Sequence, residues 1–458
     1  MAGLPVHRPE LIGAAERLPA PRPPAAVHGI LDLLWSNGHA AYLVGGAVRD
    51  VLLGRTPKDW DVATDALPER MLELFPSGRY ENRFGTVNIG DVQVTTFRRD
   101  HLYADHRRPD SVTFTESVEE DLTRRDFTVN ALAWGGKGEA HWLDPTGGAD
   151  DLRNRLLRAV GDPRRRFDED ALRLVRAVRL AAELEFEIEL GTRAAMQQAA
   201  DSVKWVSRER VGGEIRRMLA ANPPSVAFRA LLETGLLEPL LPELAAQVGV
   251  PQTKITGADL WQHTLATVDA AAALDGAGER LRLAALLHDI GKPTTFADGH
   301  FIGHDTEGAR IADELLTRLA FGRAQIEPVT RLIAQHMFSY QPSWTGAAVR
   351  RFIRRIGADL VADLLRLRQA DNVGSGLPPD AGRLDQLRER VNAELDAGVP
   401  LTLRDLAVDG SRLIDALGLA PGPVVGRLLD HLLEWVIEDA SRNEPDRLID
   451  EARTELGR

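Results

Sequence analysis

The spacing of hydrophobic positions divides this chain near residue 150. Before that point, short apolar runs bounded by glycine and polar residues are typical of strands. Beyond it, apolar residues recur every three or four positions, as in Leu172, Val175 and Val178, which is typical of helices. The pattern predicts an α+β protein with a mixed α/β head and a long all-helical body. The elements predicted in the head are helices over 26–35 and 47–53 and strands over 41–44, around Trp60 and Val62, over 87–89, over 92–97 and at 142–143.

Five segments are expected along the 458 residues. Six of the 26 prolines fall within the first 24 residues, so the chain is predicted to start with an extended or disordered lead-in. Beyond it there is no strict internal repeat. The expected segments are the lead-in over 1–25, the head over 26–152, a helical neck over 153–225, a second helical domain over 226–375 and a helical tail over 376–458.

The composition is that of an ordinary globular protein, with 44% hydrophobic and 27% charged residues. The absence of cysteine excludes disulfides, thiolate metal sites and a cysteine nucleophile. No apolar run approaches the roughly 18 residues that a membrane span needs. The N-terminus also lacks an uninterrupted apolar stretch, so we expect a cytoplasmic protein without a membrane partner.

The net charge of −12 argues against a general nucleic-acid coat protein, but it leaves room for local basic tracks. Residues 153–179 hold nine arginines against four acids. A purely basic set follows at Arg350, Arg351, Arg354 and Arg355. Each track is either a solvated helix face or a surface for a polyanion.

Two glycines and two aspartates in the head form the first chemical constellation. Gly45 and Gly46 follow a predicted strand and precede a helix, a placement in which backbone amides approach a phosphate closely. Asp59 and Asp61 are two residues apart, so on a strand both carboxylates face the same side. Such a pair can hold Mg²⁺ bridged to a triphosphate and promote in-line attack by a hydroxyl on the α-phosphate.

The segments LVGGAVRDVLLG, PKDWDVAT, EEDLTRRDFTVNALA and DPTGGADDL follow one another in this order. They resemble the class II tRNA nucleotidyltransferase and poly(A) polymerase family, bacterial CCA-adding type, within the DNA polymerase β-like superfamily. The resemblance implies a polymerase-β-like nucleotidyltransferase head, Mg²⁺ ligation by Asp59 and Asp61, and tRNA, CTP and ATP as partners. The head residues that it assigns to nucleotide binding are Gly45, Gly46, Arg49, Asp50, Arg125, Asp126 and Asn130.

The stretch FDEDALRLVRAVRLAA is predicted to be one helix, on which Asp170 and Arg173 are neighbours at spacing three and Glu169 and Arg173 at spacing four. They form either an intrahelical salt bridge or a base-reading pair. A carboxylate beside a guanidinium matches the amino group and ring nitrogen of cytosine or adenine, whereas uracil or guanine leaves buried groups unpaired. The resemblance implies that Asp170 and Arg173 are this template, assisted by Glu169. It also implies that Arg176 and Arg179 face the triphosphate.

One position departs from the family pattern. In the strand VQVTTFR the residue before Val-Thr-Thr is usually acidic in the family, and here it is Gln93, a poor metal ligand and no general base at neutral pH. On a regular strand Asp91 would face the same side as Gln93. Three interpretations stay open: Asp91 substitutes for the missing carboxylate, the enzyme is slower, or Gln93 is an engineered inactivation.

The long segment between Phe97 and Arg124 bears on which nucleotides are added. CC-adding members of the family typically shorten this loop, whose flexibility helps the pocket switch to ATP, so its retention favours full CCA or A-only addition unless it is an ordinary surface loop. We expect template-independent addition of C and A to the 3′ end of tRNA. The alternatives are an A-adding or CC-adding enzyme, a poly(A) polymerase, a metal phosphohydrolase with an impaired transferase site, and a non-catalytic RNA-binding protein.

Histidines and aspartates recur in the helical body, in WQHTL, LLHDIGKP, FIGHDTEGA, LIAQHM and LRQADN. Imidazole and carboxylate together suit a divalent transition metal such as Mn, Ni, Co or Zn, which can activate a water for phosphoester hydrolysis. The pattern is similar to the HD phosphohydrolase superfamily, which implies an accessory phosphodiesterase or phosphatase activity. The ligands that the resemblance implies are His263, His288, Asp289 and Asp371, with His304 and His336 as the extra ligands of two-metal members.

Two further segments complete the sequence picture. Residues 207–219 resemble the last head–neck motif of the family, and we expect them to pack against the base-reading helix through structural charges. In the family the distal body and tail hold the tRNA elbow by its shape and phosphates, with steep salt dependence. The basic set at 350–355 therefore either contacts RNA or is a solvated face. Nothing in the sequence indicates an oligomeric state.

Overall fold

The computed structural model of the chain describes residues 18–82, 84–101, 111–252 and 256–457. The chain divides into two compact units. The first comprises Met1–Ala221 and Val226–Pro242, and the second comprises Asn222–Ser225 and Glu243–Arg458. The predicted lead-in falls largely on residues 1–17, outside the described residues.

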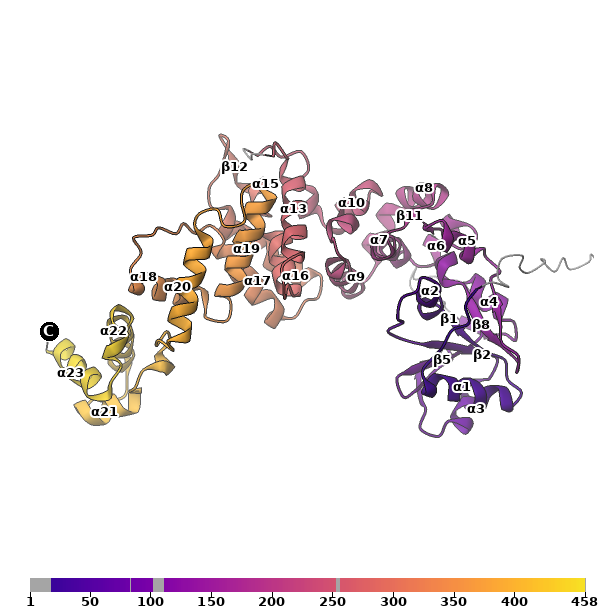
Figure 1. The fold of residues 1–458 in the computed structure, drawn as a ribbon, viewed down its shortest axis with the longest axis horizontal. Coiled ribbons are helices and arrows are strands. Elements are labelled where there is room, and N and C mark those ends of the chain that lie inside the picture. The colour runs from indigo at the N-terminus through magenta and orange to yellow at the C-terminus, as the bar shows by residue number, and fades with distance from the viewer. Residues whose placement is uncertain (1–17, 83, 102–110, 253–255, 458) are drawn as a thin grey trace, which may run out of the picture. The chain divides into compact units, whose positions relative to one another are not determined.

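A seven-stranded sheet forms the head of the first unit (Figure 1). The strand order is β3-β4-β5-β2-β1-β8-β9, in which β2 and β5 are parallel and the other neighbours antiparallel. The strands predicted at 41–44, around Val62, at 87–89, 92–97 and 142–143 are confirmed. Strands β3 and β8 of this sheet were not predicted. The bounds are β1 (Ala41–Val44), β2 (Asp61–Thr64), β3 (Arg79–Asn82), β4 (Thr86–Ile89), β5 (Val92–Thr96), β8 (Ala133–Gly136) and β9 (His141–Leu143).

The register of the central strands shows which side chains lie in one row across the sheet. Val44 lies opposite Asp61, Asp61 opposite Gln93, and Gln93 opposite Asn88. Directly opposed residues point to the same face, so these side chains form one row across four strands. Apolar residues on this face and on the segments packed against it form one hydrophobic cluster of the head, which consists of Tyr42, Val44, Ala63, Phe97, Val118, Leu122, Ala131, Ala133, Leu143 and Val160.

Short helices flank the sheet. In α1 (Ala25–Ser36) the residues Val27, Ile30, Leu31 and Leu34 are buried at helical spacing, which confirms the predicted helix. Figure 1 shows α1 and α3 lying together on one side of the sheet. A separate two-stranded ribbon forms the base of the long loop between Phe97 and Arg124, whose residues 102–110 lie outside the described residues. The remaining head elements are α2 (Gly46–Leu52), α3 (Pro68–Leu74), β6 (Arg98–His101), β7 (Ser111–Phe114), α4 (Val118–Thr123) and α5 (Gly148–Arg153).

The prediction of a single helix for the base-reading stretch is wrong. The chain forms α6 (Pro163–Glu169) and α7 (Leu172–Leu184), and Asp170 between them has an extended backbone with φ −148° and ψ 105°. The Asp170 carboxylate accepts a hydrogen bond from the backbone N–H of Leu172 at 3.0 Å. An aspartate in this place satisfies an N–H that the first turn of a helix leaves unpaired, which favours a new helix start. The helices that follow are α8 (Leu190–Ala199), α9 (Arg208–Ala220), α10 (Ser225–Glu233) and α11 (Leu237–Leu240).

The described residues of the second unit form helices, as predicted, apart from one hairpin of β12 (Phe296–Ala297) and β13 (His300–Phe301). No helix among the described residues has both the length and the apolar character that crossing a bilayer requires. The last three helices share a core of leucine, valine and isoleucine around Leu432 and Leu448. The helices are α13 (Leu260–Ala272), α14 (Glu279–Leu287), α15 (Lys292–Thr295), α16 (His304–Arg318), α17 (Arg323–Gln335), α18 (Gly346–Ile356), α19 (Val361–Gly374), α20 (Leu384–Asp396), α21 (Gly410–Leu417), α22 (Pro423–Glu438) and α23 (Pro445–Leu456).

Candidate active site and candidate metal centre

The turn after β1 brings the backbone against two charged side chains. Gly45 has a φ of +74°, a conformation that favours glycine. A Cβ at this position would lie 3.1 Å from Nη1 of Arg125 and 3.6 Å from Oδ2 of Asp61. Gly46 follows as the first residue of α2. The glycine pair therefore leaves a narrow space between backbone, guanidinium and carboxylate.

Asp59 and Asp61 lie at the start of β2, but not both on it. The strand begins at Asp61, and Asp59 lies in the exposed segment before it, so the strand expected to carry both residues carries only Asp61. Burial raises the pKa of the Asp61 carboxyl, Arg125 partly offsets this rise, and the charge of Asp59 adds to it. The charge of Asp59 thus acts on the Asp61 carboxyl, and a divalent cation beside Asp61 would stabilise its charged form.

Arg49 links the turn to the second head motif. Its guanidinium donates to Oδ1 of Asp50 at 2.9 and 2.7 Å and to Oδ1 of Asn130 at 2.7 Å. Nδ2 of Asn130 in turn donates to Oδ1 of Asp126 at 3.2 Å. Four residues assigned to the nucleotide by sequence therefore form one hydrogen-bonded chain. In this chain, Asp50 and Asn130 orient the Arg49 side chain.

Asp126 continues this chain into α7. Nε and Nη2 of Arg176 donate to its Oδ2 at 2.9 and 2.6 Å. Burial alone raises the pKa of Asp126, but the charge and hydrogen bonds of Arg176 outweigh it and hold the pKa far below its usual range. Arg179, one turn further, is buried and bound to Glu214 and Glu183. The two arginines expected at the triphosphate are therefore bound to carboxylates, because α7 packs against the head and α9 at these points.

Arg173 is held in place by three acceptors. Its Nη1 donates to Oε2 of Glu169 at 2.6 Å and to the carbonyl oxygen of Arg166 at 3.0 Å. Its Nη2 donates to the carbonyl oxygen of Arg124 at 3.3 Å. The Glu169–Arg173 pair matches the expected spacing of four. A guanidinium fixed by a carboxylate and two carbonyls is pre-organised to present its remaining N–H groups to a ligand.

Asp170 is bound to a residue that helical spacing could not find. Nη2 and Nη1 of Arg210 on α9 donate to its carboxylate at 2.6 and 3.2 Å. Among the described residues no hydrogen bond or ion pair joins the side chains of Asp170 and Arg173, because the extended backbone at Asp170 interrupts the helix; the backbone N–H of Arg173 donates to the carbonyl oxygen of Asp170 at 2.9 Å. The expectation that residues 207–219 pack against the base-reading segment is confirmed. That expectation was the only sequence signal for Arg210.

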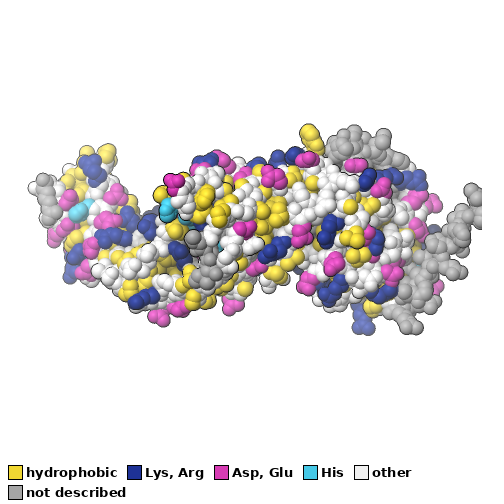
Figure 2. Space-filling view, turned by 90° about the horizontal axis from the view of Figure 1, so that it is seen from above, with side chains coloured by type: hydrophobic (Ala, Val, Ile, Leu, Met, Phe, Trp, Pro, Cys, Tyr) yellow, Lys and Arg dark blue, Asp and Glu magenta, His cyan; other side chains and the backbone are white. Residues whose placement is uncertain are grey.

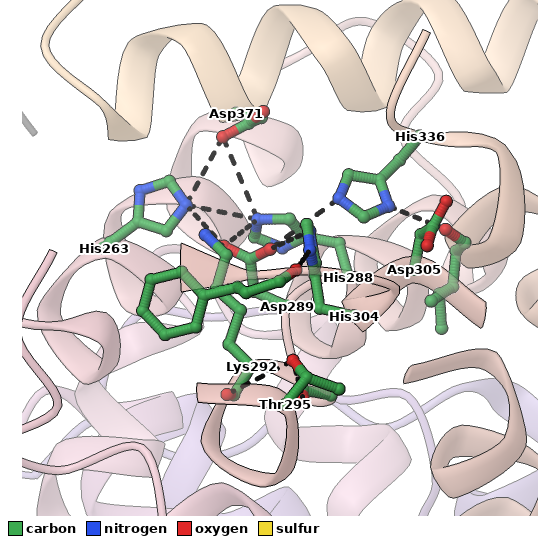
Figure 3. A network of polar contacts seen from close by, with 12 residues as sticks. His263, His288, Asp289, Lys292, Thr295, His304, Asp305, His336 and Asp371 are labelled. Carbon is green, nitrogen blue, oxygen red and sulfur yellow. Dashed lines mark hydrogen bonds and ion pairs between the residues drawn. The ribbon is translucent and has the colours of Figure 1, made fainter. Parts of the chain in front are cut away.

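Six buried side chains converge in the second unit (Figure 3). One donor set is His263, His288 and Asp371, and the other is Asp289, His304 and His336; within each set the ligand atoms lie within 4.8 Å of one another. Nε2 of His263 lies 3.1 Å from Nε2 of His288. Asp289 bridges the sets, with Oδ2 3.2 Å from Nε2 of His288 and Oδ1 3.4 Å from Nε2 of His304.

Backbone carbonyls fix the orientation of three of these imidazoles. Nδ1 of His288 donates to the carbonyl of Ala285 at 2.9 Å, and the Nδ1 atoms of His304 and His336 make equivalent bonds of 2.7 and 2.6 Å. Burial lowers the pKa of His288, so the neutral ring turns the lone pair of Nε2 toward the cluster. Converging lone pairs repel unless a cation lies between them. The donor set therefore fits divalent metal ions held by imidazole and carboxylate.

Comparisons with known proteins place this geometry in a family. Residues 41–158 match the family described as "Poly A polymerase head domain". Residues 185–248 match the family described as "Probable RNA and SrmB- binding site of polymerase A", and residues 260–374 match the family described as "HD domain". A CCA-adding enzyme of Geobacillus thermodenitrificans is 34% identical over 426 residues, 92% of this chain and 94% of the relative. One from Streptococcus mutans is 31% identical over 435 residues, 93% and 96% of the two chains.

The chain belongs to the CCA-adding enzyme family. Its structure is similar to the crystal structure of the Bacillus stearothermophilus CCA-adding enzyme in complex with CTP, with a TM-score of 0.67, 29% identity and coverage of 94% of this chain and 98% of that chain. As a CCA-adding family member the chain is a nucleotidyltransferase, and the predicted α+β architecture of head and helical body is confirmed. Nucleotidyltransferase and HD domains both imply divalent metal ions.

Gln93 stands where the resemblance led us to expect an acidic residue. It lies directly opposite Asp61 in the parallel pair β2–β5. Asp91 is not on β5, because the strand begins at Val92 and Gly90 and Asp91 form the turn before it. The regular strand on which Asp91 was expected to share the face of Gln93 therefore does not extend that far. The row next to Asp61 is Gln93 and then Asn88, whose buried Oδ1 accepts no hydrogen bond from the described residues.

Arginines of the basic set at 350–355 form hydrogen bonds and ion pairs with other residues of the second unit. Arg350 donates to the carbonyl oxygens of Ile437 and Glu438 at 2.7 and 3.0 Å, where it satisfies the last carbonyls of α22. Figure 2 shows the same intermixing of charge, with Lys and Arg side chains lying among Asp and Glu side chains. Contact of this set with RNA stays a prediction. The carboxylate pairs are Arg350–Glu394, Arg351–Glu434, Arg351–Glu438 and Arg354–Glu434.

Replacing Gly291 by alanine is expected to empty the metal centre. A Cβ there would lie 2.3 Å from the carbonyl oxygen of His304 and 2.5 Å from the backbone nitrogen of Gly308, so α16 must move away and carry His304 with it. Such overpacking costs about 1–3 kcal/mol of unfolding free energy. Elemental analysis of bound metal and thermal unfolding measure both effects. Gly278→Ala is the control, because open space surrounds Gly278 and it should keep the wild-type metal content.

Proposed function

We propose that this chain adds C and A nucleotides to the 3′ end of tRNA, with CTP and ATP as donors and no nucleic-acid template. Family membership supports the reaction. The observation that carries it for this chain is the junction of Gly45, Arg125 and Asp61 at the start of β2. That junction is joined to the base-reading segment through Arg49, Asn130, Asp126 and Arg176.

The phosphate side of the pocket is assigned to the head. Asp59 and Asp61 would hold Mg²⁺, which neutralises charge on the triphosphate during in-line transfer. Gly45 leaves room for phosphate oxygens next to its backbone. Arg125 has a buried Nε without a hydrogen-bond partner among the described residues, and its guanidinium is aimed at the space beside Asp61. Arg49, oriented by Asp50, would contact the phosphates from the other side of the turn.

The base side of the pocket is assigned to Asp170 and Arg173. Asp170 accepts from the amino group of cytosine or adenine, and Arg173 donates to the neighbouring ring nitrogen. A carboxylate has about four lone-pair sites, so Asp170 can bind Arg210 and a base amino group together. Arg210 then acts as a positioning residue. Uracil and guanine present the reverse pattern and leave these groups unpaired.

Product length tests this proposal. The protein is incubated with tRNA that ends before CCA, or in CC, together with labelled CTP, ATP or both. Addition of three nucleotides supports full CCA addition, a single A on the CC-ending substrate supports an A-adding enzyme, and a stop after CC supports a CC-adding enzyme. A long adenosine tail supports a poly(A) polymerase. No extension with either substrate would overturn the transferase proposal.

Gln93→Glu is expected to accelerate nucleotide transfer. The substitution places a carboxylate directly opposite Asp61, where it can share the divalent cation or take the proton of the attacking hydroxyl. General-base assistance is worth about a hundredfold or more. Single-turnover incorporation of CMP into tRNA measures the effect, with Gln93→Asn as the control of altered shape without charge. An unchanged rate in Gln93→Glu would show that transfer in this chain does not need a third carboxylate.

For the second unit we propose an accessory metal-dependent phosphohydrolase activity. The convergence of four imidazole Nε2 atoms on Asp289 and Asp371 supports it. The metal is a divalent transition ion of the Mn, Ni, Co or Zn type, which would supply a nucleophilic water at neutral pH. In the reaction the water oxygen bonds to phosphorus, the P–O ester bond breaks and the leaving oxygen takes a proton. Loss of phosphodiesterase activity in His288→Ala, with tRNA extension retained, is the expected result.

A further inference from the structure

A row of polar side chains crosses one face of the head sheet, beginning at Asp61. Gln93 lies opposite Asp61, Asn88 lies opposite Gln93, and Arg79 on the edge strand β3 lies opposite Asn88. Directly opposed residues point to the same face, so the four side chains lie side by side. Asp61 and Asn88 are half-buried, and Gln93 and Arg79 are exposed. The neighbouring row on the other face is buried and consists of Val62, Val94 and Val87.

Three members of this polar row have unused hydrogen-bonding capacity. The exposed carboxamide of Gln93 makes no hydrogen bond with the described residues. Oδ1 of Asn88 is buried and accepts none from them. The guanidinium of Arg79 forms no ion pair with a carboxylate of the described part of the chain. A buried acceptor without a partner costs free energy unless a ligand or water satisfies it. Beside Asp61, the row therefore offers two amides and one cation to a ligand.

We propose that this row binds the last nucleotide of the tRNA that is being extended, and that Gln93 and Asn88 recognise its 2′ hydroxyl. The inference rests on the transferase function proposed above. Attack on the α-phosphate brings the 3′ oxygen of the tRNA to the cation held by Asp61. The 2′ hydroxyl is on the neighbouring carbon of the same ribose, and the 5′ phosphate lies beyond the ring. Neighbouring strands are about 4.8 Å apart, so the amides follow Asp61 directly and Arg79 lies roughly 14 Å away at the phosphate end.

An amide matches this hydroxyl in both hydrogen-bonding directions. A 2′ hydroxyl donates and accepts, and a carboxamide offers N–H donors and a carbonyl acceptor, whereas an ionised carboxylate only accepts. The neutral amide of Gln93 also adds no negative charge beside the phosphates. Arg79 supplies a charged contact to the phosphate, which positions the RNA without reading its bases. The row therefore selects ribose over deoxyribose at the acceptor end, whatever base that nucleotide carries.

Two acceptors that differ in one oxygen atom test this inference. A tRNA that ends before CCA is prepared with ribose or 2′-deoxyribose at its last nucleotide, and single-turnover incorporation of CMP is measured with each. We expect the wild type to extend the ribose end about tenfold faster, because the deoxyribose end leaves a hydrogen-bonding group unpaired. Gln93→Ala and Asn88→Ala should each lower this ratio toward one. An effect of the 2′ hydroxyl on the reactivity of the 3′ oxygen alone would persist in both variants. A wild-type ratio near one, or an unchanged ratio in both variants, overturns the inference.

Arg79→Ala separates the phosphate contact from the recognition of the hydroxyl. This variant should keep the ribose preference, bind tRNA more weakly and lower the slope of log affinity against log salt by roughly one. Arg70→Ala is the matched control, because Arg70 is an exposed arginine of α3 that pairs with Glu73, and it should keep the wild-type slope. A wild-type slope in Arg79→Ala would contradict the phosphate contact.

A binding measurement separates this inference from the transferase proposal. The affinities of the two tRNAs are measured by fluorescence titration with Mg²⁺ and without CTP. If neither tRNA is extended when CTP is added, the transferase proposal fails, and the affinities alone decide whether the row binds the acceptor end. Tighter binding of the ribose end that is lost in Gln93→Ala upholds the inference. Equal affinity of the wild type for both ends overturns it.

Discussion

Asp61→Asn is expected to abolish nucleotide transfer and to leave the fold intact. Asp61 begins β2 between Arg125 and Asp59, and its carboxylate is one of the two assigned to Mg²⁺. An amide in this place binds the cation weakly, and the lost charge stabilisation of several kcal/mol corresponds to about a thousandfold or more in rate. Single-turnover incorporation of labelled CMP into tRNA that lacks CCA measures the effect.

Asp91→Asn is the control for this substitution. Asp91 is an exposed carboxylate in the turn before β5, and we expect its variant to transfer CMP at the wild-type rate. A comparable loss in Asp91→Asn would instead make Asp91 the substitute for the missing acidic residue at position 93. Retention of most of the activity in Asp61→Asn would contradict the assignment of the metal site. Far-UV circular dichroism and thermal unfolding of the variant check that the fold is intact.

The second large effect concerns the choice of base. Asp170→Ala and Arg173→Ala are each expected to lower the preference for CTP over UTP by roughly tenfold to a hundredfold, because each removes one of the two groups that are left unpaired by uracil. Ratios of kcat/KM for CTP and UTP measure this, and the affinity for tRNA should change little. Arg210→Ala is expected to shift the same ratio in the same direction, since Arg210 holds the Asp170 carboxylate.

Arg164→Ala provides the matched control for base choice. Arg164 is an exposed arginine on α6, whose side chain lies outside the bonds that hold Glu169 and Arg173. Its variant should keep the wild-type ratio. An equal loss of activity with CTP, ATP, UTP and GTP in Arg173→Ala would assign Arg173 a structural role. An unchanged ratio of kcat/KM for CTP and UTP in both Asp170→Ala and Arg173→Ala would contradict the assignment of these two residues as the base-reading template.

Local patterns in the sequence were sufficient to locate the elements that depend on neighbouring residues. The strand at 41–44, the glycine turn and the helix after it follow from short-range hydrophobic spacing and from the backbone freedom of Gly45. The six metal-binding candidates also lie together, because His and Asp on buried helix faces have few other stable arrangements. For these features the sequence-based expectation and the structure agree.

Features that depend on distant partners could not be derived from spacing. Helical spacing predicted that Asp170 and Arg173 would be neighbours on one helix, either as a salt bridge or as a base-reading pair. The Asp170 carboxylate instead binds the first turn of a new helix, and its ion-pair partner is Arg210, forty positions away. In the same way, Arg179 was expected at a phosphate, although α9 brings Glu214 against it. Charged residues on buried faces find opposite charges in tertiary packing, and the pattern of one helix does not show which element will supply them.

The most direct test of the account is a structure of the full chain with CTP and Mg²⁺. The account predicts the triphosphate beside Asp59, Asp61 and Arg125, with the cytosine amino group within hydrogen-bond distance of Asp170 and the ring nitrogen within reach of Arg173. A cytosine ring bound away from the segment between α6 and α7, or a triphosphate out of contact with the two aspartates, would contradict it.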